Sequence, residues 1–107
     1  MRRAATFRAP LASGGAAAFR RLEADLRRDD DLQVIGVDTG RMEVRGEGSW
    51  WFHGRWRVEG NELALEVFSK ATGIQALAAW LPIRQALRTT QLGLDALARR
   101  VGDPSAK

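Results

Sequence analysis

The sequence predicts an α+β fold, because helical and strand-like segments occupy separate parts of the chain. Apolar residues recur every three or four positions over residues 13–28 and 74–101, the spacing of a helix that buries one face. Between these segments, over residues 33–70, the apolar period changes to two, which is typical of half-buried strands. We therefore expect an N-terminal strand and helix, a four-stranded antiparallel meander, and a long C-terminal helix packed on the sheet.

The N-terminal segment predicts one strand and one helix. Residues 3–11 alternate apolar and polar side chains, and Pro10 is tolerated at the edge of a sheet, so an edge strand is expected. Ser13 is expected to cap the following helix. The buried stripe of that helix is predicted to consist of Ala18, Phe19, Leu22 and Leu26. The acidic run 29–31 is interpreted as a solvated loop at the helix exit, not as a cation site, because three consecutive carboxylates cannot all face one ion.

Three turns set the expected register of the meander, whose strands are predicted at 33–38, 41–46, 49–58 and 62–70. Each turn aligns apolar residues across neighbouring strands. The turns at 39–40, 46–48 and 60–61 respectively predict the pairs Val37 with Met42, Val44 with Trp50, and Trp56 with Leu65. The opposite face then carries mixed charges, with Arg55 across from Glu66.

The C-terminal segment predicts one helix with an interruption. Pro82 lies inside the helical pattern of residues 74–101, so a kink is expected there. Leu94, Leu97 and Val101 continue the apolar stripe, and Gly102 follows as a stop signal. Together with the preceding elements, this helix predicts a single domain over residues 1–107.

Composition excludes several classes of function. The 107-residue chain contains no Cys and one His, so disulfides, thiolate catalysis and Cys-ligated zinc are excluded, and no metal or other cofactor is predicted. No apolar run approaches the roughly 20 residues that span a bilayer. Arg8 and Pro10 interrupt the segment that would follow the basic N-terminus of a secretory leader, so we expect a cytoplasmic protein.

The net charge of +4 raises the question of a nucleic-acid partner. Arginines concentrate on the two predicted helices and on one face of the sheet. Acidic residues, including Glu23, Asp25 and Asp95, interrupt each of these stripes. Binding surfaces for nucleic acid have few interleaved acids, so this partner is not favoured.

One local motif carries a family resemblance. The stretch Gly48–Glu59, GSWWFHGRWRVE, is similar to the W-W-[YF]-x-G-x-[WY]-x-V strand of small actinobacterial proteins in the helix-grip superfamily, which includes START lipid-transfer domains and polyketide cyclase-like proteins. The predicted order of elements resembles the same fold in a truncated form. The resemblance implies a pocket for a hydrophobic ligand between the sheet and the terminal helix.

The residues expected to line such a pocket are the large apolar side chains of one sheet face, one glycine among them, and the facing side of the last helix. They are Met42, Val44, Trp50, Phe52, Gly54, Trp56, Leu65, Val67, Leu81 and Leu87. The same side chains also have an ordinary interpretation as the core of a small domain.

The other sheet face supplies candidates for an interaction surface, namely Trp51, His53, Arg55, Arg57, Phe68 and Lys70. His53 has no predicted carboxylate and nucleophile beside it, and no other catalytic set is evident, so the sequence does not favour an enzyme. The leading hypothesis is a domain that binds an apolar small molecule or serves as an accessory module without its own catalysis. The alternatives are a protein-interaction or homodimerisation module through this sheet face and, third, a binder of single-stranded nucleic acid.

Overall fold

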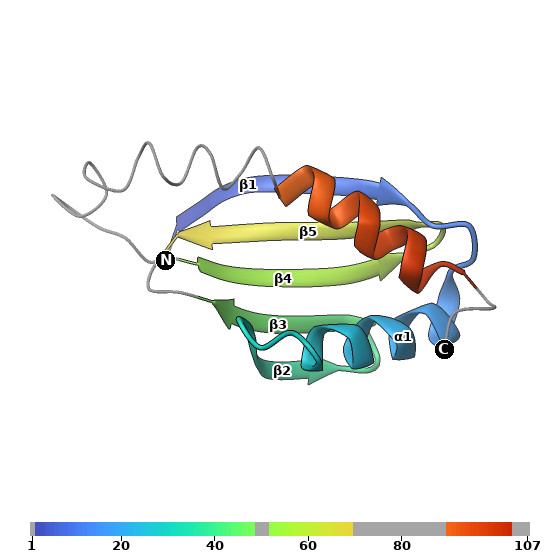
Figure 1. Ribbon diagram of the computed structural model, residues 1–107, viewed down its shortest axis with the longest axis horizontal. Coiled ribbons are helices and arrows are strands. Elements are labelled where there is room, and N and C mark those ends of the chain that lie inside the picture. Colours follow the sequence, from blue (N-terminus) through green and yellow to red (C-terminus); the bar gives the residue numbers. More distant parts are fainter. Residues whose placement is uncertain (1, 49–51, 70–89, 104–107) are drawn as a thin grey trace, which may run out of the picture.

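The computed structural model describes residues 2–48, 52–69 and 90–103. This part of the chain has an α+β fold, with a five-stranded antiparallel sheet and two helices that lie on the same face of the sheet (Figure 1). The labelled elements are β1 (Arg2–Pro10), α1 (Gly15–Arg27), β2 (Gln33–Asp38), β3 (Glu43–Gly48), β4 (Phe52–Glu59) and β5 (Glu62–Ser69). The C-terminal helix spans residues 90–101.

The strand order is β1-β5-β4-β3-β2, so the N-terminal strand extends the sheet beyond the four expected strands. β1 pairs antiparallel with β5 and forms one edge, as its sequence predicts. The pairing sets Phe7 opposite Leu65 and Ala9 opposite Leu63. These apolar pairs lie on the face of the sheet that the helices cover, which we call the inner face. Their cross-strand contacts explain why β1 pairs with β5.

The β4–β5 hairpin confirms its predicted register. Val58 pairs with Leu63, Trp56 with Leu65 and Gly54 with Val67. The turn holds Gly60 at a φ of 58°, a conformation that glycine adopts without steric cost.

The β2–β3 hairpin corrects the register expected from the turn at 39–40. Asp38 pairs with Glu43, so the loop contains four residues, the last of which, Met42, has a φ of 53°. Val37 pairs with Val44 instead of Met42. A β-bulge at Ile35 then inserts one extra residue into β2, so Val34 and Val37 share a face of the sheet and Ile35 is left exposed.

The β3–β4 connection also differs from the prediction. β3 continues through residues 46–48, which were expected to form a turn, and the connection falls at residues 49–51. Val44 therefore pairs with Trp56 and not with Trp50. Gly46 and Gly54 face each other in this ladder. A Cβ atom on Gly46 would lie 3.2 Å from Cζ3 of Trp56. Close packing against the indole ring therefore explains why a glycine occupies this position in the middle of a strand.

α1 begins without the side-chain cap that was expected from Ser13. Gly14 occupies the N-cap position and no side chain caps the helix. A Cβ atom on Gly14 would lie 2.0 Å from the backbone oxygen of Gly60, so the β4–β5 turn leaves no room for a capping side chain at this position. Leu11 donates its N–H to the carbonyl of Asn61 at 2.7 Å, and this hydrogen bond also holds the segment before α1 against the β4–β5 turn.

The helices supply the buried stripes that the sequence predicts. On α1 these are Ala18, Phe19, Leu22 and Leu26, and on the C-terminal helix they are Leu94, Leu97, Ala98 and Val101. The second helix ends at residue 101, as expected, whereas Pro82 and residues 74–89 lie outside the described residues. Nε of Arg21 donates a hydrogen bond to the carbonyl of Val101, which ties α1 to the end of the C-terminal helix.

Candidate functional site

A cleft of about 700 Å³ lies between α1, the C-terminal helix and the inner face of the sheet. The two helices cover different parts of that face, α1 toward β2 and the C-terminal helix toward β1 (Figure 1). The apolar side chains of the cleft are Leu26, Leu32, Trp56, Leu65, Leu94 and Leu97. Pockets for small molecules commonly measure about 300–1,000 Å³ and have mostly apolar walls, so size and lining both suit such a ligand.

Trp56 and Leu65 form the floor of the cleft. They stand opposite each other on β4 and β5, and strand alternation points both toward the helices. Both residues are buried, with 6% and 3% of their surface exposed. Strand pairing and the space left by Gly46 therefore hold the indole ring in place.

Gly93 gives the cleft open space on the C-terminal helix. It lines the cleft between the buried helix residues and Thr90. A Cβ atom built on Gly93 would have nothing within 4 Å. A methyl group at this exposed position would therefore meet no neighbour.

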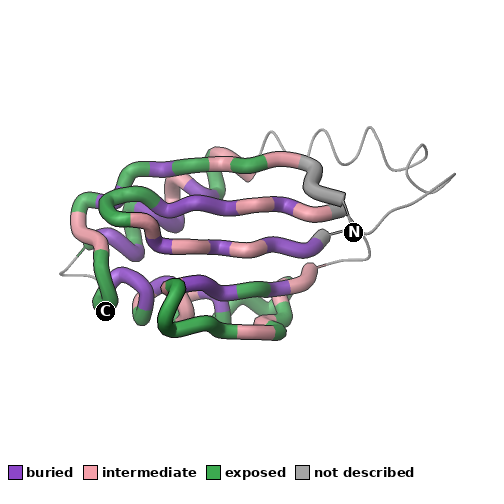
Figure 2. Tube along the Cα trace, turned by 180° about the vertical axis from the view of Figure 1, so that it is seen from behind, coloured by how far each residue is buried: buried purple, intermediate pink, exposed green. Residues whose placement is uncertain are grey.

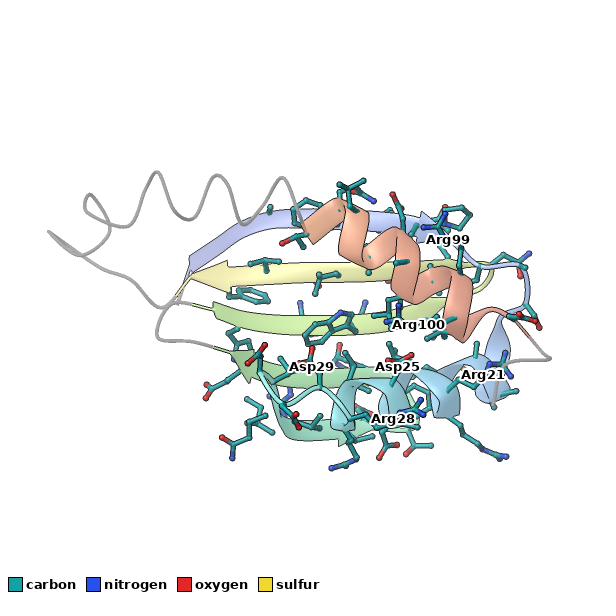
Figure 3. All side chains as sticks on the ribbon, in the orientation of Figure 1. Arg21, Asp25, Arg28, Asp29, Arg99 and Arg100 are labelled. Carbon is teal, nitrogen blue, oxygen red and sulfur yellow. The ribbon has the colours of Figure 1, made fainter. Side chains whose placement is uncertain are left out.

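The mouth of the cleft is acidic. Among the described residues, Asp25, Asp29 and Asp31 line it, together with the cation Arg100. In Figure 3, Asp25 and Asp29 lie on the side of α1 that faces the C-terminal helix, whereas Arg28 lies on the other side. Nε of Arg100 donates to Oδ2 of Asp25 at 3.0 Å, which joins the two helices across one end of the cleft.

The loop after α1 orients the remaining carboxylates. Oδ1 of Asp29 accepts the N–H of Asp31 at 2.9 Å, and the carbonyl of Asp29 accepts the N–H of Leu32 at 3.2 Å. This turn brings Leu32 back toward the sheet. Both carboxylates therefore stand beside an apolar wall, at the C-terminal end of a helix, where the helix dipole is also negative.

Figure 2 shows the other face of the sheet, which neither described helix covers and which we call the outer face. This face carries a network of ion pairs. Its centre is Glu43, whose side chain is 8% exposed. Nη2 of Arg57 lies 2.7 Å from Oε1 of Glu43, and Nε of Arg55 lies 3.6 Å from the same oxygen. Arg55 also pairs with Glu66 at 2.6 Å, which realises the predicted cross-strand pair.

The network continues to the β1 edge. Nη1 of Arg8 contacts Glu59 at 2.9 Å and Glu62 at 3.2 Å, and Arg57 also contacts Glu59 at 3.2 Å. The hydrogen bond from Arg8 lowers the pKa of Glu59, and the bond from Arg57 adds to this effect. The hydrogen bond to Glu43 raises the pKa of Arg57. These arginines are therefore neutralised by carboxylates of the same sheet.

His53 lies on the outer face, as predicted, but it is 9% exposed. Its ring meets Phe68 edge-on with centroids 5.8 Å apart, and the guanidinium carbon of Arg55 lies 5.4 Å from the centre of Phe68. The predicted turn at 46–48, which sets Val44 opposite Trp50, would also set Arg41 opposite His53. In the structure the residue opposite His53 on β3 is Glu47. Nδ1 of His53 lies 3.6 Å from Oε1 of Glu47, beyond normal hydrogen-bond distance.

The predicted pocket residues occupy different places. Trp56 and Leu65 line the cleft. Val44 and Val67 are fully buried in the core, and Gly54 is buried in the middle of the inner face. Met42 belongs to the β2–β3 loop and packs against the edge of the core. Phe52 begins β4 opposite Gly48. Trp50, Trp51, Lys70, Leu81 and Leu87 lie outside the described residues.

Sequence reasoning missed several residues of the site, which include Leu26, Leu32 and Leu97 as well as two carboxylates and a glycine. The sequence predicts only a solvated loop for Asp29 and Asp31, and it predicts no role in the site for Gly93. A usable signal existed for the acids, because carboxylates at the C-terminal end of a helix oppose its dipole and are unfavourable there. Gly93 sits in a helical pattern, where glycine is also unfavourable.

Other kinds of site find no support in the part of the chain that is described. Residues 2–48, 52–69 and 90–103 contain no group of three or more His, Asp or Glu side chains arranged to share a metal ion. Among the same residues, neither helix combines the length and apolar character needed to cross a membrane. Comparison with known proteins finds no matching family model, no matching curated protein and no matching solved structure.

Proposed function

We propose that this protein binds an apolar small molecule in the cleft between the sheet and the helices, as a ligand-binding or accessory domain without its own catalysis. The observation that carries the proposal is the cleft of about 700 Å³ with Trp56 and Leu65 as its floor. The resemblance to the helix-grip superfamily points to the same place, since it implies a hydrophobic pocket between sheet and terminal helix. A cytoplasmic location accords with a chain that has no cysteine.

The outer face supports the alternative functions less well. The cations expected to meet a nucleic acid are Arg55, Arg57 and Lys70. Arg55 is already paired with Glu66 and Arg57 with Glu43, and Lys70 lies outside the described residues. The exposed large apolar residues among those described are Ile35, Val37 and Leu92, and none of them lies near Phe68 at the centre of the proposed interaction surface. A partner at this face would have to replace satisfied ion pairs without gaining a large apolar area.

A neutral apolar dye and one blocking variant test the proposal. Nile red fluorescence should rise when the dye binds the purified protein. Gly93→Leu should weaken that binding about tenfold or more, the effect of losing about 1.4 kcal/mol of contact. The thermal unfolding midpoint should not fall, because the added side chain enters open space. Leu92→Ala is the matched control, since Leu92 is 70% exposed on the same helix and does not line the cleft.

Two results would overturn the proposal. One is the absence of saturable Nile red binding by the wild-type protein. The other is equal binding by wild type and a folded Gly93→Leu variant. Native mass spectrometry of the protein as purified adds an independent measurement, because a co-purified apolar molecule would appear as a mass increment that Gly93→Leu reduces.

A further inference from the structure

We propose that the cleft selects ligands in which a cationic group is attached to an apolar body, and that it disfavours anionic amphiphiles such as fatty acids. This inference rests on the proposed function, because it concerns the ligand class of the same cleft. Its basis is the charge of the mouth compared with the apolar floor beneath it. Asp29 and Asp31 line this cleft together with the apolar side chains of Leu26 and Leu32.

The acidic groups at the mouth are only partly neutralised. Of the described residues that line the cleft, Arg100 carries a positive charge, and its Nε lies 3.0 Å from Oδ2 of Asp25. Among the described residues, neither Asp29 nor Asp31 forms an ion pair, and the contact of Asp29 is with a backbone N–H. Two carboxylates therefore remain to meet a cationic group that projects from a ligand in the cleft. An anionic headgroup at the same place would meet like charges.

The local charge opposes the charge of the whole chain. The sequence carries a net +4, so a non-specific long-range attraction would favour anions. The described residues at the cleft mouth contribute three carboxylates and one guanidinium. If the cleft prefers cationic ligands, the preference must therefore come from the charges at its mouth and not from the overall charge of the protein.

The position of the acids adds a second argument. α1 ends at Arg27, and the carbonyls of its last turn, including those of Ala24 and Leu26, accept N–H groups of the exit residues. This is the negative end of the helix dipole, where further negative charge costs stability. Residues that break a local stability rule are expected at functional sites, and Asp29 and Asp31 break this rule beside the cleft.

The experiment compares three ten-carbon probes below their micellar concentrations. Decyltrimethylammonium, decanol and decanoate compete with Nile red at pH 7 in low salt. We expect decyltrimethylammonium to displace the dye at a concentration about tenfold lower than decanoate, with decanol between them. Added salt should narrow this difference, because the carboxylates are exposed to solvent.

A matched pair of variants assigns the preference to particular residues. The double variant Asp29→Asn with Asp31→Asn keeps an oxygen acceptor for the turn and removes both charges, so the preference for the cation should fall to about twofold or less. Asp30→Asn is the control, because Asp30 is exposed in the same run but does not line the cleft. This control should retain the full preference.

The outcomes separate the two proposals. If the probes and Nile red all fail to bind, the proposed function itself fails. If all three probes displace Nile red equally, or if decanoate is the strongest competitor, the cleft binds ligands but the charge preference is overturned. If Asp30→Asn reduces the preference as much as the double variant does, the effect is one of general charge, and the assignment to Asp29 and Asp31 is wrong.

Discussion

The two faces of the sheet are built by the same strands but are stabilised differently. On the inner face, Val44 and Trp56 are removed from water by the helices. On the outer face, which neither of the two described helices covers (Figure 2), the alternate residues Glu43 and Arg57 form an ion pair. Burial is non-directional and tolerates a gap where two helices diverge, whereas ion pairs need defined geometry. A ligand-sized cleft is therefore expected on the inner face, and a surface of satisfied charges on the outer face.

The largest effect should follow from emptying the inner face. Trp56→Ala should lower the free energy of unfolding by about 3–5 kcal/mol, because the ring is buried against Val44, Leu65 and Gly46. Urea denaturation measures the change. Arg45→Ala, an exposed outer-face substitution on β3, should change stability by no more than about 0.5 kcal/mol. If both variants lost similar amounts, the distinction between the faces would be wrong.

A smaller effect is expected from the centre of the outer network. Glu43→Gln should cost about 1–2 kcal/mol, because it keeps an oxygen acceptor but removes the negative charge that pairs with both Arg55 and Arg57. The loss stays below that of a fully buried pair, since about a third of each arginine side chain is exposed and can rehydrate. Glu62→Gln, at a half-exposed pair with Arg8, is the control and should cost less than about 0.5 kcal/mol. Equal losses in the same urea titration would show that burial of Glu43 is irrelevant.

A gain in stability is expected on the cleft side of the C-terminal helix. Gly93→Ala should raise the free energy of unfolding by about 0.5–1 kcal/mol, because alanine favours the helix and its methyl group meets no neighbour. Thermal unfolding measures the gain. A lower midpoint than wild type would indicate that the space beside Gly93 is occupied, which would weaken the case for an open cleft.

The comparison of hairpins explains how much of the fold could be predicted from sequence. The Gly60-Asn61 turn gave the correct register because a two-residue turn with glycine fixes the pairing of its strands. The register predicted from a two-residue turn at Thr39-Gly40 is wrong, because the loop has four residues. The loop ends at Met42 in a left-handed conformation, which is rare for a residue with a side chain. The bulge at Ile35 changes which residues of β2 face the inner side of the sheet, and no local residue pattern predicts such an insertion.

The site was less predictable than the fold. Trp56 and Leu65 followed from strand alternation, because a single face and register decide where they point. Asp29 and Asp31 come from a loop that lines the same cleft as the other helix, so their role depends on tertiary structure that local spacing does not encode. The extent of the cleft depends on how far apart the two helices lie, which is likewise a tertiary property.

The smallest predicted effect is the pH dependence of the outer network at Glu59. Its hydrogen bond from Arg8, reinforced by Arg57, lowers the pKa of Glu59 from the ordinary value of 4.5. A lowered pKa in the folded state adds stability above the ordinary value, and this stability is lost as the pH falls through the folded-state pKa. Glu59→Gln should therefore cost less than about 1 kcal/mol at pH 7, given that these side chains are partly or largely exposed.

The same variant predicts how that difference changes with acid. The wild-type and Glu59→Gln unfolding free energies should converge as the pH falls below about 4.5, since protonated Glu59 and glutamine then present similar neutral groups to Arg8. Urea titrations at several pH values between 7 and 3 measure the convergence. A constant difference over this range would mean that the Glu59 charge adds nothing to stability. The outer face would then owe its order to the strand ladder beneath it, and its ion pairs would serve only to keep the arginines occupied.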